Sequence, residues 1–332
     1  SLFPEGGNLV AGMQNQVGFK AVNKEGKPVT VSGTLLKGNE PVLRFTSVYA
    51  GIGSFLFTPE KNATYRIKLE NNKDSLYMLP ELQDTGVVMQ LVKNENDSLT
   101  FKLATNQTSE KRIFLRLQIR GTVQSMATAI LKDSLAIKMP VENSSRGIAE
   151  ATVFDEQGHI LAEKLVYLHA DRKLKISISQ VKERYAQKEK VTVKIKTTGT
   201  DGKPMPAVLS LRVYDRLFQN QVNSRDIGSY YLLSTQLRGN VYDPLYYFDS
   251  THKDRKAVLN LLLLCQEQRQ YAWNEEVLKE NAAKQKPVLT DSLRAVITAV
   301  RSSSKEKKPV SLMFFNYNKS ASQVAVADNS GS

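Results

Sequence analysis

Few side chains in this sequence are of the types that supply general bases, nucleophiles or zinc ligands. Histidine and cysteine do most of this chemistry, and the 332 residues include three histidines and one cysteine. His159, His169 and His252 are separated along the chain, and the sequence has neither a Gly-x-Ser-x-Gly elbow nor a phosphate-binding glycine loop. The sequence therefore predicts a protein that is not an enzyme and that holds no cofactor or metal ion.

The tripeptide Asp-Ser-Leu occurs four times, which exceeds the chance expectation for one tripeptide. Its serines are Ser75, Ser98, Ser134 and Ser292. An Asp-Ser pair closes a turn and the leucine begins a strand, so the repeat has a structural explanation. The tripeptide also resembles the O-glycosylation acceptor pattern of envelope proteins in some Gram-negative bacteria. This resemblance implies glycans on four accessible strand starts.

Positive charge is concentrated between residues 164 and 196, where 10 Lys or Arg and 3 Asp or Glu give a net charge of +7. The basic side chains alternate with apolar ones, so they should share the outward face of a sheet. Such a face could bind nucleic acid, lipid headgroups or an anionic glycan, or it could be a solvated edge that discourages aggregation. No aromatic platform is interleaved, which argues against single-stranded nucleic acid, and we expect no nucleic-acid partner. The candidate residues are Lys173, Lys175, Lys190, Lys194 and Lys196.

A tyrosine-rich loop covers residues 242–248, and its candidate contact residues are Tyr242, Tyr246 and Tyr247. Tyrosine is enriched at interfaces, so the loop could recognise a partner. The alternative is that the loop, which joins two expected helices, packs onto the neighbouring sheet.

The elements that must position these residues are mostly short strands. Over residues 1–217, strand patterns alternate with turn signals about every 8–12 residues, which is typical of immunoglobulin-like β-sandwiches. Helical spacing replaces this pattern near residues 226–283, where Asp226 can cap a helix that ends before Gly239 and a longer helix should cover residues 253–283. The sequence predicts a mainly β fold of tandem sandwiches with a helical insert.

Five units follow from these patterns. We expect a sandwich over residues 1–72, a second over 73–171, a third with the helical insert over 172–250, a helical segment and linker over 251–286, and a truncated β unit over 287–332. The last unit has only three expected strands, at residues 293–301, 309–318 and 323–328, so we expect it to be incomplete and mobile.

The composition fits a folded chain without a membrane-spanning segment. Hydrophobic residues are 41% and charged residues 24%, and 46 Lys and Arg against 33 Asp and Glu give a net charge of +13. The longest apolar run, residues 261–265, is far shorter than the ~20 residues that span a bilayer. Wholesale disorder, collagen and a disulfide-rich scaffold are excluded.

Several segments resemble macroglobulin-like cell-envelope proteins of Gram-negative bacteria, which are similar to alpha-macroglobulins. They are residues 2–10 (LFPEGGNLV), 51–59 (GIGSFLFTP), 229–239 (SYYLLSTQLRG), 243–248 (DPLYYF) and 261–273, in the family's order. The resemblance implies macroglobulin-like sandwiches, and it extends to a carboxypeptidase-regulatory-like β domain that starts near residue 293. Some members also carry a TonB-dependent receptor plug.

Thioester members of the alpha-macroglobulin family carry a Cys-x-Glu-Gln motif, and residues 265–268 match it in residue type. In those members the cysteine sulfur and the glutamine carbonyl form a reactive thioester at the start of a helix. Here Cys265 lies inside a leucine-rich helical pattern and extends its apolar face. A buried free cysteine behaves as a small hydrophobic residue, so we predict a thiol within the core.

The function that these features favour is non-catalytic: a structural or binding segment of a larger exported protein, in the periplasm or at the outer-membrane surface. Its expected partners are the other domains of the same polypeptide and an envelope protein or glycan. The alternative is a module of a TonB-linked nutrient-uptake protein that contacts a ligand. A thioester protease inhibitor is a third and weaker candidate.

Overall fold

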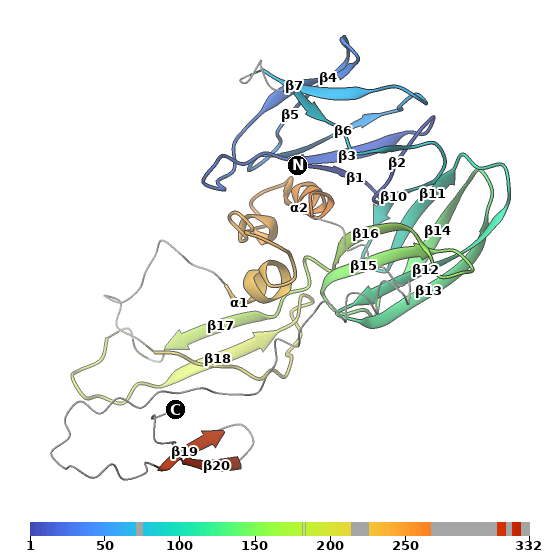
Figure 1. Ribbon diagram of the computed structural model, residues 1–332. Coiled ribbons are helices and arrows are strands. Elements are labelled where there is room, and N and C mark those ends of the chain that lie inside the picture. The colour runs from blue at the N-terminus through green and yellow to red at the C-terminus, as the bar shows by residue number, and fades with distance from the viewer. Residues whose placement is uncertain are drawn as a thin grey trace. The chain divides into compact units, whose positions relative to one another are not determined.

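Strands dominate the computed structural model, as the alternating apolar residues predict (Figure 1). It describes residues 1–70, 76–180, 182, 184–213 and 226–266, and the two strands at 311–316 and 321–326. The chain divides into one unit at Ser1–Tyr271 and a second at Ala272–Ser332. The predicted fold class, a mainly β chain of tandem sandwiches, is confirmed.

The first sandwich packs a three-stranded sheet, ordered β1-β3-β6, against a four-stranded sheet, ordered β5-β4-β7-β8. Their strands are β1 (Leu2–Pro4), β3 (Asn15–Lys20), β4 (Ser32–Lys37), β5 (Glu40–Thr46), β6 (Ile52–Phe57), β7 (Tyr65–Leu69) and β8 (Leu76–Met78). Between the sheets lies an aromatic-rich core that includes Phe19, Phe45 and Phe55. Phe19 and Phe45 have ring centroids 4.9 Å apart, a separation at which aromatic pairs attract.

A short parallel pair completes the first sandwich: β2 (Leu9–Val10) pairs with β9 (Leu82–Gln83). Because β8 and β9 both pair with strands of this sandwich, it extends to Gln83, past the end expected at residue 72.

The second sandwich has sheets ordered β10-β11-β14 and β13-β12-β15-β16. Its strands are β10 (Val87–Asn94), β11 (Ser98–Thr105), β12 (Lys111–Ile119), β13 (Thr122–Leu131), β14 (Ser134–Pro140), β15 (Gly147–Phe154) and β16 (Ile160–Leu168). Alternate residues of β12, among them Ile113, Leu115 and Leu117, are fully buried in the core between the sheets. This burial follows the period of two seen in the sequence.

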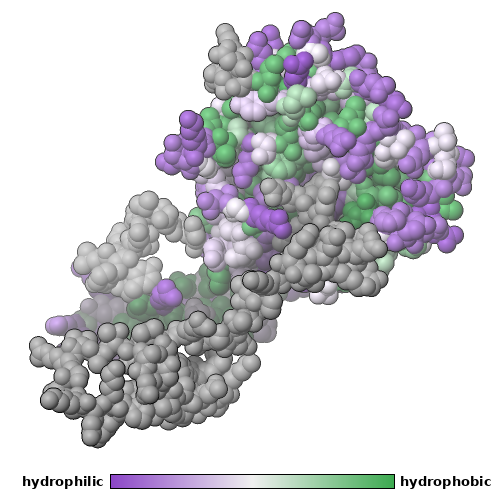
Figure 2. Space-filling view, viewed as in Figure 1, coloured by the Kyte–Doolittle hydropathy of each residue, from purple (hydrophilic) through white to green (hydrophobic). Residues whose placement is uncertain are grey.

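Where a third sandwich was expected, the described residues form a two-stranded sheet of β17 (Lys175–Gln180) and β18 (Val193–Thr198). The strand pattern that the sequence continues to residue 217 gives no paired strand at residues 206–213, which lack regular secondary structure and are exposed. Apolar side chains of this sheet remain uncovered, among them Ile176 at 51% and Ile178 at 62% exposure. Figure 2 shows hydrophobic residues at the place that β17 and β18 occupy in Figure 1.

The helical insert, residues 226–266, is here called the helical cap. It contains α1 (Ile227–Ser229), the π-helical turn η3 (Tyr230–Ser234), the 3-10 turn η4 (Tyr246–Phe248) and α2 (Arg255–Leu264).

The capping prediction at the start of the helical cap is confirmed, since the Asp226 side chain accepts a hydrogen bond from the amide of Ser229. The expected helix from 226 to 238 is wrong beyond its first turns. Ser234 donates its hydroxyl to the carbonyl of Ser229 and the Thr235 amide donates to Tyr230, which widens the helix and ends it.

The second predicted helix begins at Arg255 and ends at Leu264, well before residue 283. The part of that prediction beyond Gln266 lies outside the described residues. In the second unit, β19 (Ser311–Asn316) and β20 (Ala321–Val326) pair as an antiparallel hairpin. The strand expected at 293–301 also lies outside the described residues, and the incompleteness of this unit stays a prediction.

Candidate functional site

The helical cap packs on both sandwiches through one shared apolar core. Ile52 of the first sandwich and Ile148 and Tyr167 of the second meet the buried leucines of α2 there. Both faces of β16 are therefore buried, since Val166 belongs to the second sandwich's core and Tyr167 to the core under the helical cap. A helix covered in this way holds the two sandwiches together.

Gly18 of β3 allows α2 to approach the first sandwich closely. A Cβ atom at this position would lie 2.8 Å from Leu264 Cγ and 3.1 Å from Cys265 Sγ, closer than side chains pack. The Cys265 thiol donates a hydrogen bond to the carbonyl of Phe19 at 3.2 Å. The end of α2 thus rests directly on the backbone of β3.

Cys265 is a buried free thiol, as the sequence predicted. Burial raises the pKa of this thiol to about 12, so the nucleophilic thiolate is scarce at neutral pH. Its motif partner Gln268 lies outside the described residues.

We expect the native chain to react with a maleimide at Cys265 far more slowly than the chain in denaturant, because thiolate and access are both lacking. Intact-mass spectrometry over time measures this. Rapid native labelling would contradict the core assignment, as would an intact mass that is lower by one ammonia, the mark of a thioester.

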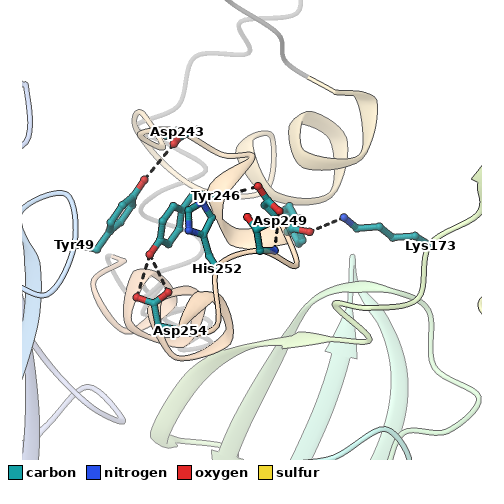
Figure 3. Close-up of polar contacts among 9 residues, drawn as sticks. Tyr49, Lys173, Asp243, Tyr246, Asp249, His252 and Asp254 are labelled. Atoms are coloured by element: carbon teal, nitrogen blue, oxygen red, sulfur yellow. Dashed lines mark hydrogen bonds and ion pairs between the residues drawn. The ribbon is translucent and has the colours of Figure 1, made fainter.

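Three aromatic rings, one from the loop between β5 and β6 and two from the helical cap, form a stack (Figure 3). The Tyr49 and Tyr246 centroids are 3.9 Å apart, and those of Tyr246 and His252 are 4.1 Å apart, with interplanar angles of 20° and 25°. Tyr247 is buried and meets Tyr49 edge-on. The aromatic loop therefore packs onto the neighbouring sandwich, which is the structural alternative considered for it.

Carboxylates accept hydrogen bonds from the stacked tyrosines. Tyr246 Oη lies 2.9 and 3.0 Å from the two carboxylate oxygens of Asp254, and Tyr49 Oη lies 3.3 Å from Asp243 Oδ2. Burial, aided by the nearby charge of Asp243, raises the pKa of both Tyr49 and Tyr247. The hydroxyls of Tyr49 and Tyr247 therefore stay protonated at neutral pH, which suits packing better than proton transfer.

The segment just before β17 is anchored to the helical cap by charged groups. The Lys173 ammonium donates to the carbonyl of Phe248 at 2.7 Å (Figure 3). Arg255 and Lys256 of α2 pair with Asp171 at 2.5 and 2.6 Å. Burial acts to raise the pKa of Asp171, but the bonds and charges of these two cations outweigh it and lower the pKa.

The structure separates the five lysines named from the sequence. Lys175 pairs with Thr198, and Lys194 and Lys196 pair with serines of β17, so these three lysines share one exposed face. Lys190 is exposed in the loop before β18. Lys173 contacts the helical cap instead.

Tyr242 is 57% exposed and lines an open groove of about 2190 Å³. Its walls include residues 22–23 and 25–31, strand β8 and residues 238–245, and Tyr77 and Met78 add exposed apolar surface. Of the sequence-predicted tyrosines, Tyr242 is the one with surface available to a ligand.

The glycosylation candidates differ in access. Ser98 begins β11 and Ser134 begins β14, as expected. Ser134 is exposed, but Ser98 is 2% exposed and its hydroxyl donates to Asp97 at 2.8 Å. The expected accessibility is therefore wrong at Ser98, because the side chain is buried although it lies on the opposite face of β11 from the core residue Leu99. Ser75 and Ser292 lie outside the described residues.

His169, which directly follows β16, is buried and neutral. Its Nε2 lies 2.9 Å from the carbonyl of Val141, which can only accept, so this nitrogen carries the proton. Burial lowers the pKa of His169 below its ordinary value of 6.5, and the charge of Arg172 adds to this.

The unfolded chain therefore binds this proton more readily than the folded chain, and stability should fall as the pH drops below 6.5. We expect His169→Asn, which tolerates the residue's left-handed backbone (φ 53°), to flatten the dependence of the free energy of unfolding on pH as the pH falls below 6.5. Urea unfolding at several pH values measures it. An unchanged slope in the variant would contradict the assignment.

Within the described residues, no group of three or more His, Cys, Asp and Glu side chains is arranged to hold a metal ion. No helix there is long and apolar enough to cross a membrane.

Neither a family model nor a curated protein matches this chain. Solved structures similar to parts of it include the adhesin InvE of Yersinia pseudotuberculosis, at 12% identity over 51% of this chain and 58% of that one, with a TM-score of 0.20. Native alpha-2-macroglobulin of E. coli is 11% identical over 60% of this chain and 17% of its own, also with a TM-score of 0.20. A Ruminococcus gnavus beta-glucuronidase is 12% identical over 49% and 36%, with a TM-score of 0.18. These likenesses are too weak to carry an argument about function.

One contact between the two sandwiches was not predicted from the sequence. Lys164 of β16 and Glu5 form an ion pair at 2.6 Å, with each side chain 3% exposed. Lys164 alternates with Ala162 and Val166 on the inward face of β16. A lysine at an inward position was the signal that a buried carboxylate must lie nearby.

Proposed function

We propose that this chain is a non-catalytic structural and binding segment of a larger macroglobulin-like protein of the Gram-negative cell envelope. The observation that carries the proposal is the shared core in which one helical cap packs on two sandwiches, here called the joint. Such a joint fixes the direction of successive domains, which is the task of a spacer or scaffold.

The side chains of the most reactive types pack where the helical cap meets the sandwiches. Cys265 lies against the backbone of β3, and Tyr246 is enclosed between Tyr49 and His252. Groups whose faces and hydrogen bonds are already used are poor candidates for substrate chemistry. This supports the non-catalytic proposal over the thioester alternative.

The proposed location is the periplasm or the outer-membrane surface, and it rests on the resemblance of the sequence segments. Fractionation of the source cells with an antibody against this chain tests it, with and without external protease. We expect the protein in the envelope fraction. Recovery in the cytoplasmic fraction would overturn it.

A module of a TonB-linked uptake protein is the second candidate, and the groove beside Tyr242 favours it. An oligosaccharide array is a suitable probe, with Tyr242→Ala as the groove variant and Tyr230→Ala, 47% exposed and outside the groove lining, as the matched control. Binding that Tyr242→Ala alone abolishes would support ligand contact. Equal loss in both variants, or no binding, would count against it.

The lysine face of β17 and β18 should bind polyanions only through charge. We expect affinity for a heparin-type polyanion to fall steeply with salt, because counterion release drives such binding. Lys194→Gln with Lys196→Gln should weaken it and lessen the salt slope. Titrations at several salt concentrations measure this, and tight binding to one defined oligonucleotide at physiological salt would contradict it.

A further inference from the structure

The edge of β18 that faces away from β17 is contacted by the following chain at one end only. β17 pairs along one side of β18, and in the described residues no ladder covers the other side. At its end, however, the chain turns back through residues 199–203, where Gly199 donates to the carbonyl of Lys203 at 2.9 Å. The turn needs Gly202, whose φ is +78°.

The returning chain already makes the first contacts of a new strand. The Met205 amide donates to the carbonyl of Thr197 at 3.1 Å, and Thr197 Oγ1 donates to the carbonyl of Met205 at 2.6 Å. Thr198 and Pro204 form an antiparallel bridge. These contacts are the nucleus of a hairpin, and they fix its register.

Continuing that register places apolar residues opposite apolar residues. Ile195 would face Ala207, Val193 would face Leu209 and Val191 would face Leu211. Directly opposite residues share a face of the sheet, and Ile195 already faces Ile178 of β17. The alternation of residues 206–212 therefore matches the edge that they lie beside, although a shift by one residue would have placed every side chain on the wrong face.

The segment has much apolar surface to cover. Leu209 is 40% and Leu211 62% exposed, and the residues they would face, Val193 and Val191, are 38% and 50% exposed. An open strand edge with exposed apolar residues attracts another strand. The chain's own segment, tethered by a short turn, has the advantage over any strand from outside because its effective concentration is high.

We infer that residues 206–212 are a strap that closes on β18 as the third strand of this sheet. Closure would place Arg212 beside Lys190 at one end of the lysine face and would give the opposite face a continuous apolar surface. The occupant of the β18 edge is then this chain's own segment and not a partner's strand.

Paired cysteines test the closure. Because 197 and 205 are joined by a hydrogen bond, 194 and 208 are a non-hydrogen-bonded pair with Cα atoms expected about 4.5 Å apart, a distance a disulfide can bridge. Lys194→Cys with Val208→Cys is the test variant, and Lys194→Cys with Leu209→Cys, whose side chains would point to opposite faces, is the matched control. The native Cys265 is buried and free, so it should not interfere.

We expect an intrachain disulfide in the test variant under mild oxidation, formed at least about tenfold faster than in the control, as for a pair preorganised by local structure. Equal rates in the two variants would overturn the strap. Disulfide-linked dimers would overturn it too, because they would show that the edge takes a strand from a second copy.

Hydrogen exchange on the unaltered chain gives an independent readout. The strap predicts slow exchange at the amides of Ala207, Leu209 and Leu211, which would donate to β18, and fast exchange at the alternate amides of Val208 and Ser210. Uniformly fast exchange over residues 206–212 would overturn the inference even if the cysteine variants failed to fold.

Discussion

Glu5→Gln is expected to lower the free energy of unfolding by about 3–5 kcal/mol, because it leaves the Lys164 ammonium buried without its counter-charge. The ion pair measures 2.6 Å, and both side chains are almost wholly shielded from water. Glu5 also accepts a hydrogen bond from the Leu91 amide, so the carboxylate reaches into the second sandwich. Urea unfolding followed by circular dichroism measures the loss.

Two control variants separate this effect from a general effect of charge. Glu110→Gln removes the partner of Lys132, a pair at 3.2 Å with both side chains more than half exposed, and should cost less than about 1 kcal/mol. Glu5→Leu together with Lys164→Met removes both charges and should recover much of the loss. If Glu5→Gln cost no more than Glu110→Gln, the pair would not hold the junction.

Leu264→Ala is expected to destabilise the chain by about 2–5 kcal/mol, because it opens a cavity where the helical cap meets the first sandwich. Leu264 is 5% exposed and lies against Gly18 of β3, which has no side chain that could fill the space.

The matched control is Leu56→Ala in β6, where the leucine is 52% exposed and the change should stay within about 0.5 kcal/mol. Thermal unfolding of both variants beside the parent chain decides the comparison. Equal losses at Leu264 and Leu56 would show that α2 does not contribute to the joint.

The strands of the two sandwiches could be predicted because alternation is a local property. Ile113, Leu115 and Leu117 are apolar at every second position, and all three lie in the core. The N-cap at Asp226 was predictable for the same reason, since it depends on residues within one turn. Likewise, the position of Cys265 on an apolar stripe was enough to predict its burial.

The joint could not be predicted, because its contacts connect residues that are far apart in the sequence. Nothing near Glu5 indicates that Lys164 is its partner, and nothing near Tyr49 indicates the ring of Tyr246. The helix expected after Asp226 failed because serine and threonine hydroxyls compete for its backbone groups. The end of the first sandwich was wrongly predicted at residue 72, because the short strand β8 has a weak local pattern. This strand is defined by its pairing with β7.

The helical cap and the buried ion pair join the two sandwiches into one rigid unit. Spin labels on Arg44→Cys in the first sandwich and Met126→Cys in the second test it most directly, since both positions are exposed and Cys265 is buried. Pulsed electron paramagnetic resonance gives the distribution of distances between the labels. We expect one narrow distribution that broadens in Leu264→Ala. A broad distribution in the otherwise unaltered chain would contradict it, because the sandwiches would then move independently.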